Sequence, residues 1–267
     1  MKNILTIAGS DSCGGAGIQA DIKTFCAHGT YAMSVITAVT AQNTCGVTDV
    51  QDIDSKIVEA QLDAIFTDIC VDAVKIGMLS DSKIIHVVAE KLKFYKPKII
   101  VLDPVMISKS GYKLLKQESV GLLISKLLPL VTVVTPNIPE AETICDMKIS
   151  NEDNAIKALY MIYSMGAKNV LLKGGHLDGD PVDRLYDGNK IYSFNSERIN
   201  TKNTHGTGCT LSSAIAANLA LGYDIQKAVE LAKMYVLLGI KNSIELGHGV
   251  GLINHFYELY KKAGLNV

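Results

Sequence analysis

The chain has 267 residues, of which 48% are hydrophobic, and this content is enough to fill the core of one large α/β domain. Its 26 Lys and Arg residues balance 27 Asp and Glu residues, so the charge predicts neither a nucleic-acid nor a membrane partner. The apolar run at residues 4–8 is too short for a signal peptide, and no apolar run reaches the roughly 18 residues of a membrane helix. We therefore expect a cytoplasmic protein in which any phosphate site is local.

Short β-branched runs alternate with longer amphipathic runs, a pattern typical of strands and crossover helices in a mostly parallel sheet. The predicted strands are residues 4–8, 34–40, 73–76, 99–102, 131–135 and 169–173. The predicted helices between them are residues 17–27, 55–67, 81–94, 117–127 and 151–165. The strands are almost continuously apolar, as expected when helices cover both faces of the sheet.

The pattern changes after Lys173. The turn at residues 186–189 separates two short runs, 183–185 and 191–192, and predicts a pair of antiparallel strands at one edge of the sheet. The rest of the chain is predicted to be helical, at residues 210–221, 224–242 and 250–261. We find no repeat, linker or charge block, so we predict a single domain, 1–267.

Ligands of an open parallel sheet bind at the carboxyl ends of its strands. The polar or glycine-rich segments that follow the predicted strands are residues 9–11, 42–44, 77–78, 103–106, 136–140, 174–176 and the turn before Cys209. We expect several of them to converge on one crevice.

The turn before Cys209 is the most informative of these segments. Gly206 and Gly208 let the backbone approach an anion, and the helix that follows presents unpartnered amides and a positive dipole end. We expect the same field to lower the pKa of the Cys209 thiol below its reference value of about 8.5. A partly ionised thiol beside an anion hole can act as a base.

The first glycine-rich loop, residues 9–17, lies between a predicted strand and a predicted helix. It lacks the lysine of a P-loop and does not match G-x-G-x-x-G, so substrate contact or tight packing is favoured over phosphate binding. Asp11 is its candidate functional residue. Gln42 follows the next strand, and its amide can both donate to and accept from an aminopyrimidine edge, although an isolated Gln can also cap a loop.

Further candidates follow the later strands. Asp103 follows a predicted strand, a position that suits contact with a metal, contact with an incoming hydroxyl, or a loop cap. Asn137 and Glu140 form an N-x-x-E at a strand-to-helix turn, which suits either Mg²⁺ or a helix capping box, and the spacing alone favours the box. Lys173, at a strand end before two glycines, can neutralise phosphate charge.

The histidines and cysteines suggest no metal centre. His205 could activate Cys209, but their spacing favours a histidine that shapes the turn or orients a neighbour. The histidines at 28, 86, 176, 248 and 255 form no ligand pattern, and the six cysteines include no C-x-x-C pair. Neither a zinc site nor a disulfide framework is indicated.

Seven ordered segments together carry a family resemblance. They are residues 14–21, 41–44, 75–79, 103–106, 135–137, 173–176 and 204–210. With these segments the chain resembles the hydroxymethylpyrimidine/phosphomethylpyrimidine kinases of thiamine biosynthesis, within the ribokinase-like superfamily, over nearly its whole length. The resemblance implies a three-layer α/β/α sandwich with a mostly parallel central sheet, and a homodimer.

The resemblance also implies an activity: the enzyme uses ATP, with Mg²⁺, to phosphorylate 4-amino-5-hydroxymethyl-2-methylpyrimidine and then its monophosphate. The implied substrate residues are Gly9, Asp11, Gln42, Met78 and Val105. The implied anion hole is Gly206, Thr207 and Gly208, with Cys209 as general base and Lys173 beside it; Lys173, Thr204 and Gly208 are expected to contact the nucleotide. The implied magnesium residues are Asp103, Asn137 and Glu140.

Two alternatives stay open. A pyridoxal or pyridoxine kinase of the same branch shares the glycine-rich first loop and the cysteine-bearing turn, and Gln42 is the residue that favours the pyrimidine. A sensor that binds the pyrimidine without consuming ATP is disfavoured by the presence of Cys209, Lys173 and the N-x-x-E. Cys13 stands where the family often has Ser or Gly.

Overall fold

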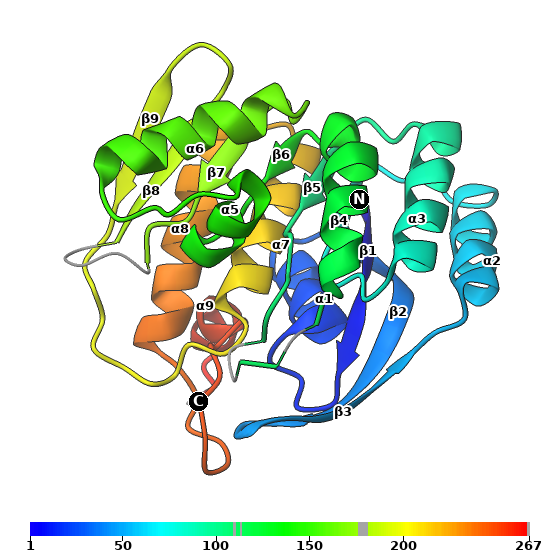
Figure 1. The fold of residues 1–267 in the computed structure, drawn as a ribbon. Coiled ribbons are helices and arrows are strands. Elements are labelled where there is room, and N and C mark those ends of the chain that lie inside the picture. The colour runs from blue at the N-terminus through cyan, green and yellow to red at the C-terminus, as the bar shows by residue number, and fades with distance from the viewer. Residues whose placement is uncertain (109–110, 113, 176–180, 266–267) are drawn as a thin grey trace.

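The computed structural model describes residues 1–108, 111–112, 114–175 and 181–265 (Figure 1). Within these residues, nine strands form one sheet in the order β3-β2-β1-β4-β5-β6-β7-β8-β9. The strands are β1 (Asn3–Asp11), β2 (Tyr31–Asn43), β3 (Gly46–Asp52), β4 (Ala73–Ile76), β5 (Ile100–Leu102), β6 (Val133–Val134), β7 (Val170–Leu172), β8 (Val182–Tyr186) and β9 (Ile191–Asn195).

The central strands are parallel and the edges are antiparallel. β2, β1, β4, β5, β6 and β7 pair in parallel, whereas β3, β8 and β9 run antiparallel to their neighbours. The predicted hairpin at residues 183–192 is confirmed as β8 and β9. The parallel strands bring their carboxyl ends to one edge of the sheet, where ligands of such folds bind.

Helices cover both faces of the sheet (Figure 1). They are α1 (Gly17–Ala27), α2 (Ser55–Phe66), α3 (Ser82–Tyr95), α4 (Val120–Leu122), α5 (Ile138–Cys145), α6 (Glu152–Ser164), α7 (Thr207–Ala220), α8 (Ile225–Lys241) and α9 (Tyr257–Lys262). One buried cluster joins the sheet to α2, α3, α5 and α6, and a second joins it to α1, α7 and α8. The predicted three-layer α/β/α fold is confirmed.

Side chains at several helix starts explain where those helices begin. The carboxylates of Asp54, Asp81 and Asp224 accept hydrogen bonds from amides in the first turns of α2, α3 and α8, and Asn151 does the same for α6. Each such cap satisfies a backbone donor that has no intrahelical partner, and is worth roughly 1 kcal/mol.

Some predicted elements differ in the structure. The predicted helix at residues 117–127 is a series of short 3₁₀, α and π turns: η1 (Gln117–Ser119), α4, η2 (Leu123–Leu127) and η3 (Leu128–Leu130), the last containing Pro129. The predicted helix at 250–261 begins only at Tyr257, because Leu252 pairs instead with His205 and Ile244 as an isolated β-bridge. β3 was not predicted, since its sequence alternates weakly.

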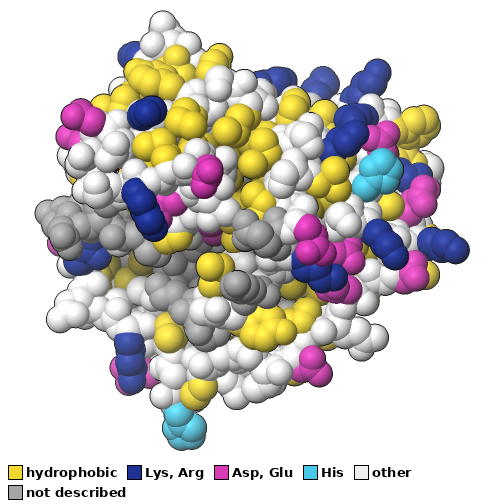
Figure 2. Space-filling view, in the orientation of Figure 1, with side chains coloured by type: hydrophobic (Ala, Val, Ile, Leu, Met, Phe, Trp, Pro, Cys, Tyr) yellow, Lys and Arg dark blue, Asp and Glu magenta, His cyan; other side chains and the backbone are white. Residues whose placement is uncertain are grey.

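On the face shown in Figure 2, basic and acidic side chains lie close to one another, in keeping with the net charge of −1. Across the described ranges, no helix has both the length and the apolar character needed to cross a bilayer.

Candidate active site

One cavity of about 1000 Å³ opens at the carboxyl ends of the parallel strands. Every residue that the sequence predicted for the site lines it: Gly9, Asp11, Gln42, Met78, Asp103, Val105, Asn137, Glu140, Lys173, Thr204, Gly206, Thr207, Gly208 and Cys209. His176 lies outside the described residues. Segments from residue 9 to residue 209 therefore converge on one crevice, as the strand order requires.

The turn before α7 forms one wall of the cavity. α7 begins at Thr207 and not at Thr210, so Gly208 and Cys209 lie in its first turn, where helical amides have no intrahelical acceptor. Gly206 precedes the helix with φ 83°, and a Cβ there would overlap the Gly15 carbonyl oxygen. The turn thus requires glycine both for its left-handed backbone and for its contact with the first loop.

Lys173 and Asp103 adjoin this helix start. The Lys173 ammonium lies 2.8 Å from Asp103 Oδ1 and 3.9 Å from Glu140 Oε2. A Cβ added at Gly208 would lie 3.5 Å from Lys173 Nζ and 3.6 Å from Asp103 Oδ2. A cation and a helix N-terminus therefore face the same point, which is the arrangement that a phosphate group needs.

Burial and neighbouring charges shift the pKa values of Lys173, Asp103 and Glu140. Burial disfavours the charged ammonium, but the carboxylates of Asp103 and Glu140 outweigh that effect and raise the pKa of Lys173. Burial opposes ionisation of Asp103 as well, yet Lys173 and Lys75 lower its pKa overall. For Glu140, burial dominates and raises the pKa to about 7, with Lys173 opposing and Asp103 adding to the rise.

Asn137 and Glu140 form the capping box of α5. The Asn137 side chain accepts from the Glu140 amide at 2.9 Å, and Glu140 Oε2 accepts from the Asn137 amide at 2.8 Å. This confirms the capping-box interpretation without excluding a metal, because a carboxylate offers about four lone-pair sites. Two buried carboxylates, Asp103 and Glu140, face one lysine, and Asp103 adds to the burial that raises the pKa of Glu140. This donor set fits Mg²⁺, which prefers carboxylate oxygens and water.

The environment of Cys209 overturns one prediction. Burial raises the pKa of the Cys209 thiol to about 11, and the carboxylates of Asp21 and Asp103 act in the same direction. Lys75 and the Gly17 amide lower it, but not enough. The expected low pKa is therefore wrong: desolvation and two nearby anions outweigh the effects of Lys75 and the Gly17 amide.

Asp11 lines the cavity, and its carboxylate also binds the first loop and the turn before α7. It accepts hydrogen bonds from the amides of Cys13, Gly15 and Ala16, at 2.8 to 3.1 Å. It also lies 2.9 Å from Nε2 of His205. These bonds hold the first loop against the turn before α7. Burial raises the pKa of Asp11, but the hydrogen bonds from His205 and from the amides of Ala16 and Cys13 outweigh burial and lower the pKa overall.

His205 and Gln42 meet at the same place. Gln42 Nε2 lies 3.3 Å from His205 Nε2, and Gln42 Oε1 accepts from the Thr40 hydroxyl at 3.2 Å. Among the described contacts of the His205 side chain, Nε2 donates to the Asp11 carboxylate and lies beside the Gln42 amide nitrogen, and Cys209 is not a partner. These contacts are consistent with a histidine that shapes the turn or orients a neighbour.

An apolar wall completes the cavity. A Cβ added at Gly9 would lie 3.0 Å from the Met78 sulfur, so Gly9 places Met78 directly against the end of β1. Val105 lines the same cavity. Together with the Gln42 amide, this wall can hold a flat heterocycle by its face and by one polar edge.

The sequence from residue 11 to residue 254 matches the family described as Phosphomethylpyrimidine kinase. The chain belongs to this family.

Relatives support the assignment. The chain is 48% identical to a hydroxymethylpyrimidine/phosphomethylpyrimidine kinase of Rhizobium meliloti over 261 residues, which cover 96% of this chain and 98% of that protein. It is 49% identical to the thiamine biosynthesis bifunctional protein ThiED of Geobacter sulfurreducens over 254 residues, or 95% of this chain. It spans about half of that longer protein, 52%.

Solved structures of both expected kinds resemble this family member. A phosphomethylpyrimidine kinase from Clostridium difficile 630 is 54% identical with a TM-score of 0.81, covering 90% of this chain and all of the other. An ADP complex of Bacillus subtilis pyridoxal kinase is 41% identical with a TM-score of 0.90, covering 96% of this chain and 98% of the other. The fold is therefore shared with pyridoxal kinases, and side chains must distinguish the substrates.

The sequence reasoning missed one pair in this phosphomethylpyrimidine kinase family member. Lys75 lines the cavity, and its ammonium lies 2.9 Å from both carboxylate oxygens of Asp21. Asp21 also accepts from the hydroxyls of Thr6 and Ser213, at 2.5 and 2.6 Å. Burial opposes the charge on Lys75, but Asp21 and the nearby anions raise its pKa. The only signal was a lysine inside an apolar strand.

Proposed function

We propose that the chain transfers the γ-phosphoryl group of ATP to 4-amino-5-hydroxymethyl-2-methylpyrimidine, and then phosphorylates the resulting monophosphate to the diphosphate, in thiamine biosynthesis. The observation that carries the proposal is the single cavity that holds Gln42, Lys173 and Cys209 together. These residues supply an edge for the ring, a cation for the transferred phosphate and a proton acceptor for the hydroxyl.

The pyrimidine would lie between the apolar wall of Gly9, Met78 and Val105 and the Gln42 amide. Gln42 can accept from the amino group and donate to a ring nitrogen through one side chain. Its contacts with Thr40 and His205 restrict its rotation, so the amide is already oriented. A fixed polar edge beside an apolar wall favours one ring orientation, which brings the hydroxymethyl group to the phosphate site.

Charge stabilisation in the transfer would come from the first turn of α7 and from Lys173. The amides of Gly208 and Cys209 would face the developing equatorial charge from the first turn of α7, and the Lys173 ammonium would face it from the end of β7. Loss of one such donor typically costs about 3 kcal/mol, or roughly 100-fold in rate. Thr204, on the turn that leads into the helix, would contact the nucleotide.

Cys209 would accept the proton of the hydroxymethyl group as its oxygen attacks phosphorus. A thiolate with a pKa near 11 is a strong proton acceptor, although only a small fraction of the thiol is ionised at neutral pH. In the second step the nucleophile is already an anionic phosphate oxygen, so the base has less to do. The two steps therefore depend on Cys209 to different extents.

Asp103 and Glu140 would hold Mg²⁺, directly or through water, with Asn137 positioning Glu140 through the capping box. The ion would neutralise phosphate charge. Lys173 stands between the two carboxylates and keeps Asp103 ionised.

A pyridoxal kinase is the second candidate, because the Bacillus subtilis pyridoxal kinase has the same fold over nearly the whole chain. The proposal is tested by incubating the protein with ATP and Mg²⁺ and, separately, with the pyrimidine or with pyridoxal, and by identifying the products by mass. We expect the pyrimidine diphosphate. Formation of pyridoxal phosphate as the only product would overturn the proposal.

A homodimer in the cytoplasm is part of the same proposal. Light scattering coupled to gel filtration should give twice the chain mass of 28.7 kDa. Cell fractionation should place the protein with cytoplasmic markers. A monomer, or a membrane-bound fraction, would contradict these two points without affecting the chemistry.

A further inference from the structure

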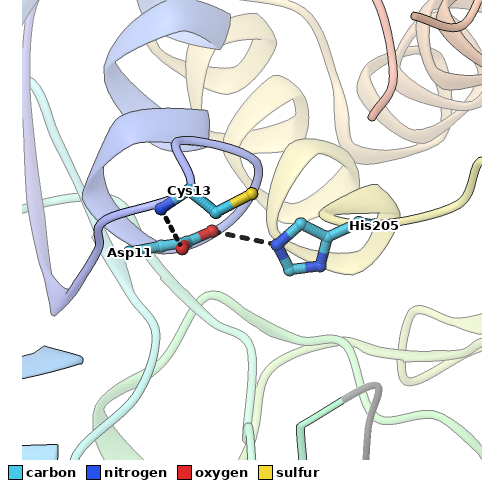
Figure 3. Close-up of side chains that lie close together, drawn as sticks. All are labelled: Asp11, Cys13 and His205. Carbon is cyan, nitrogen blue, oxygen red and sulfur yellow. Dashed lines mark hydrogen bonds and ion pairs between the residues drawn. The ribbon is translucent and has the colours of Figure 1, made fainter. Parts of the chain in front are cut away.

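Three potential metal ligands from distant parts of the sequence meet beside the cavity. Asp11 and Cys13, on the first loop, face His205 on the turn before α7 (Figure 3). A carboxylate oxygen, the thiol sulfur and an imidazole nitrogen all lie within 4.8 Å of one another. We propose that Asp11, Cys13 and His205 form a binding site for a thiophilic divalent cation, with Zn²⁺ as the preferred ion.

The spacing of the ligand atoms suits one ion. His205 Nε2 lies 2.9 Å from Asp11 Oδ2, whereas two ligands at about 2.0 to 2.1 Å from a tetrahedral zinc ion lie about 3.3 Å apart. The Cys13 sulfur lies on the same side of the loop as the imidazole (Figure 3). A zinc–sulfur bond of about 2.3 Å requires the half-buried Cys13 side chain to bring its sulfur closer to the other two ligand atoms, which now lie within 4.8 Å of it. Three protein ligands leave a fourth position for water.

The surroundings hold the ligands in place. Asp11 Oδ1 accepts from the Cys13 amide at 2.8 Å, and Oδ2 accepts from the amides of Gly15 at 3.1 Å and Ala16 at 2.8 Å, so a lone pair remains on Oδ1. Such outer contacts orient a ligand and commonly change metal affinity by 10- to 100-fold. Lys23 donates to the Gly14 carbonyl and adds positive charge nearby, which works against a cation; the carboxylate and the thiolate together balance the two charges of the ion.

Proton balance follows from the ligand chemistry. Zinc binds the thiolate, so the Cys13 proton leaves to solvent. The proton that now links His205 Nε2 to Asp11 moves to Nδ1, because the metal needs the Nε2 lone pair. One ion therefore enters and one proton leaves the protein, and affinity must increase with pH.

Occupation of this site would affect catalysis. His205 Nε2 also lies 3.3 Å from the Gln42 amide, and the residue after His205 is Gly206 of the anion-binding turn. A metal on Nε2 removes the imidazole from Gln42 and ties the first loop to that turn. We therefore expect Zn²⁺ to inhibit the kinase. This consequence rests on the proposed function, whereas the metal site itself does not.

The test uses the full chain and Co²⁺, which gives a charge-transfer absorption band when it binds a thiolate. We expect a band that saturates at one equivalent of Co²⁺ and is abolished by one equivalent of Zn²⁺. Cys13→Ser should lose the band, while Cys45→Ser, which changes an exposed cysteine on the turn between β2 and β3, should keep it. Circular dichroism and thermal melting establish that both variants are folded.

Affinity and activity give independent results. Zn²⁺ titration by calorimetry should show a Kd at least about 100-fold weaker for Cys13→Ser than for the wild type, since a direct ligand matters more than an outer contact. The ratio of activity with and without one equivalent of Zn²⁺ should fall for the wild type and for Cys45→Ser, but stay near one for Cys13→Ser. A folded wild type without the cobalt band, or the same band in Cys13→Ser, would overturn the site. Should the chain show no kinase activity even without Zn²⁺, the cobalt result still decides the metal site.

Discussion

The Lys173 ammonium lies 2.8 Å from Asp103 Oδ1, and both groups lie beside the first turn of α7. The pair joins the ends of β5 and β7 at the point where the phosphate would be transferred. Because the carboxylate holds the ammonium in place, Lys173 loses little side-chain freedom when an anion arrives.

Removing the charge of Lys173 should therefore reduce catalysis strongly. We expect Lys173→Met to lower kcat by about 100- to 1000-fold, the usual loss for one donor to developing charge. Lys168→Met, at an exposed lysine just before β7, is the matched control and should change kcat little. Since the variant also leaves Asp103 buried without its partner, its melting temperature must be measured alongside. A folded Lys173→Met with kcat within about threefold of the wild type would contradict the role.

Gly206 should tolerate no side chain. Gly206→Ala places a Cβ on the Gly15 carbonyl oxygen and imposes the left-handed backbone on alanine, which alone costs roughly 1 to 2 kcal/mol. Gly222→Ala is the matched control, because Gly222 also has positive φ, 99°, but has no neighbour within 4 Å of the added atom. Urea unfolding should show a clearly larger loss for Gly206→Ala, together with lost activity. Equal losses would mean that the contact with Gly15 does not matter.

Much of the site could be predicted from the sequence because the loops that follow parallel strands all lie at the same edge of the sheet. Because residues 73–76 and 99–102 are predicted to be buried strands, Met78 and Asp103 are expected at the carboxyl ends of those strands. In the structure both residues line the same cavity. The glycines at 206 and 208 likewise predicted a backbone turn before a helix, which begins at Thr207.

Electrostatics and long-range contacts could not be predicted in the same way. The pKa of Cys209 depends on Asp21 and Lys75, which lie on different elements, and on burial that only the folded chain defines. Nothing in the sequence of the first loop reveals that the Asp11 carboxylate accepts hydrogen bonds from three amides and from His205. The helix predicted from residue 250 begins later because Leu252 pairs with a histidine far away in the sequence.

Cys209 should matter more for the first phosphorylation than for the second. We expect Cys209→Ala to slow the first step by about 100-fold or more, the usual contribution of a positioned base, and the second step much less. Cys70→Ala, at an exposed cysteine, serves as the control. Each step is assayed separately, starting from the pyrimidine or from its monophosphate. Equal losses in the two steps would count against the base role.

The pH dependence gives a second test of the same residue. Because burial raises the pKa of Cys209 to about 11, the thiolate fraction grows by about tenfold for each pH unit between 7 and 9. The first step should therefore accelerate with pH over that range in the wild type, and this acceleration should disappear in Cys209→Ala. A first step that is flat with pH in both proteins would show that no group with a raised pKa takes the proton.

The most direct measurement of the central claim is a competition between substrates. The wild-type protein is given ATP, Mg²⁺ and equal concentrations of the hydroxymethylpyrimidine and pyridoxal, and the products are followed over time by mass spectrometry. The arrangement of Gln42, Lys173 and Cys209 in one cavity predicts that the pyrimidine monophosphate appears first, is converted to the diphosphate, and accumulates ahead of any pyridoxal phosphate. Preferential formation of pyridoxal phosphate, with the pyrimidine left unphosphorylated, would contradict it.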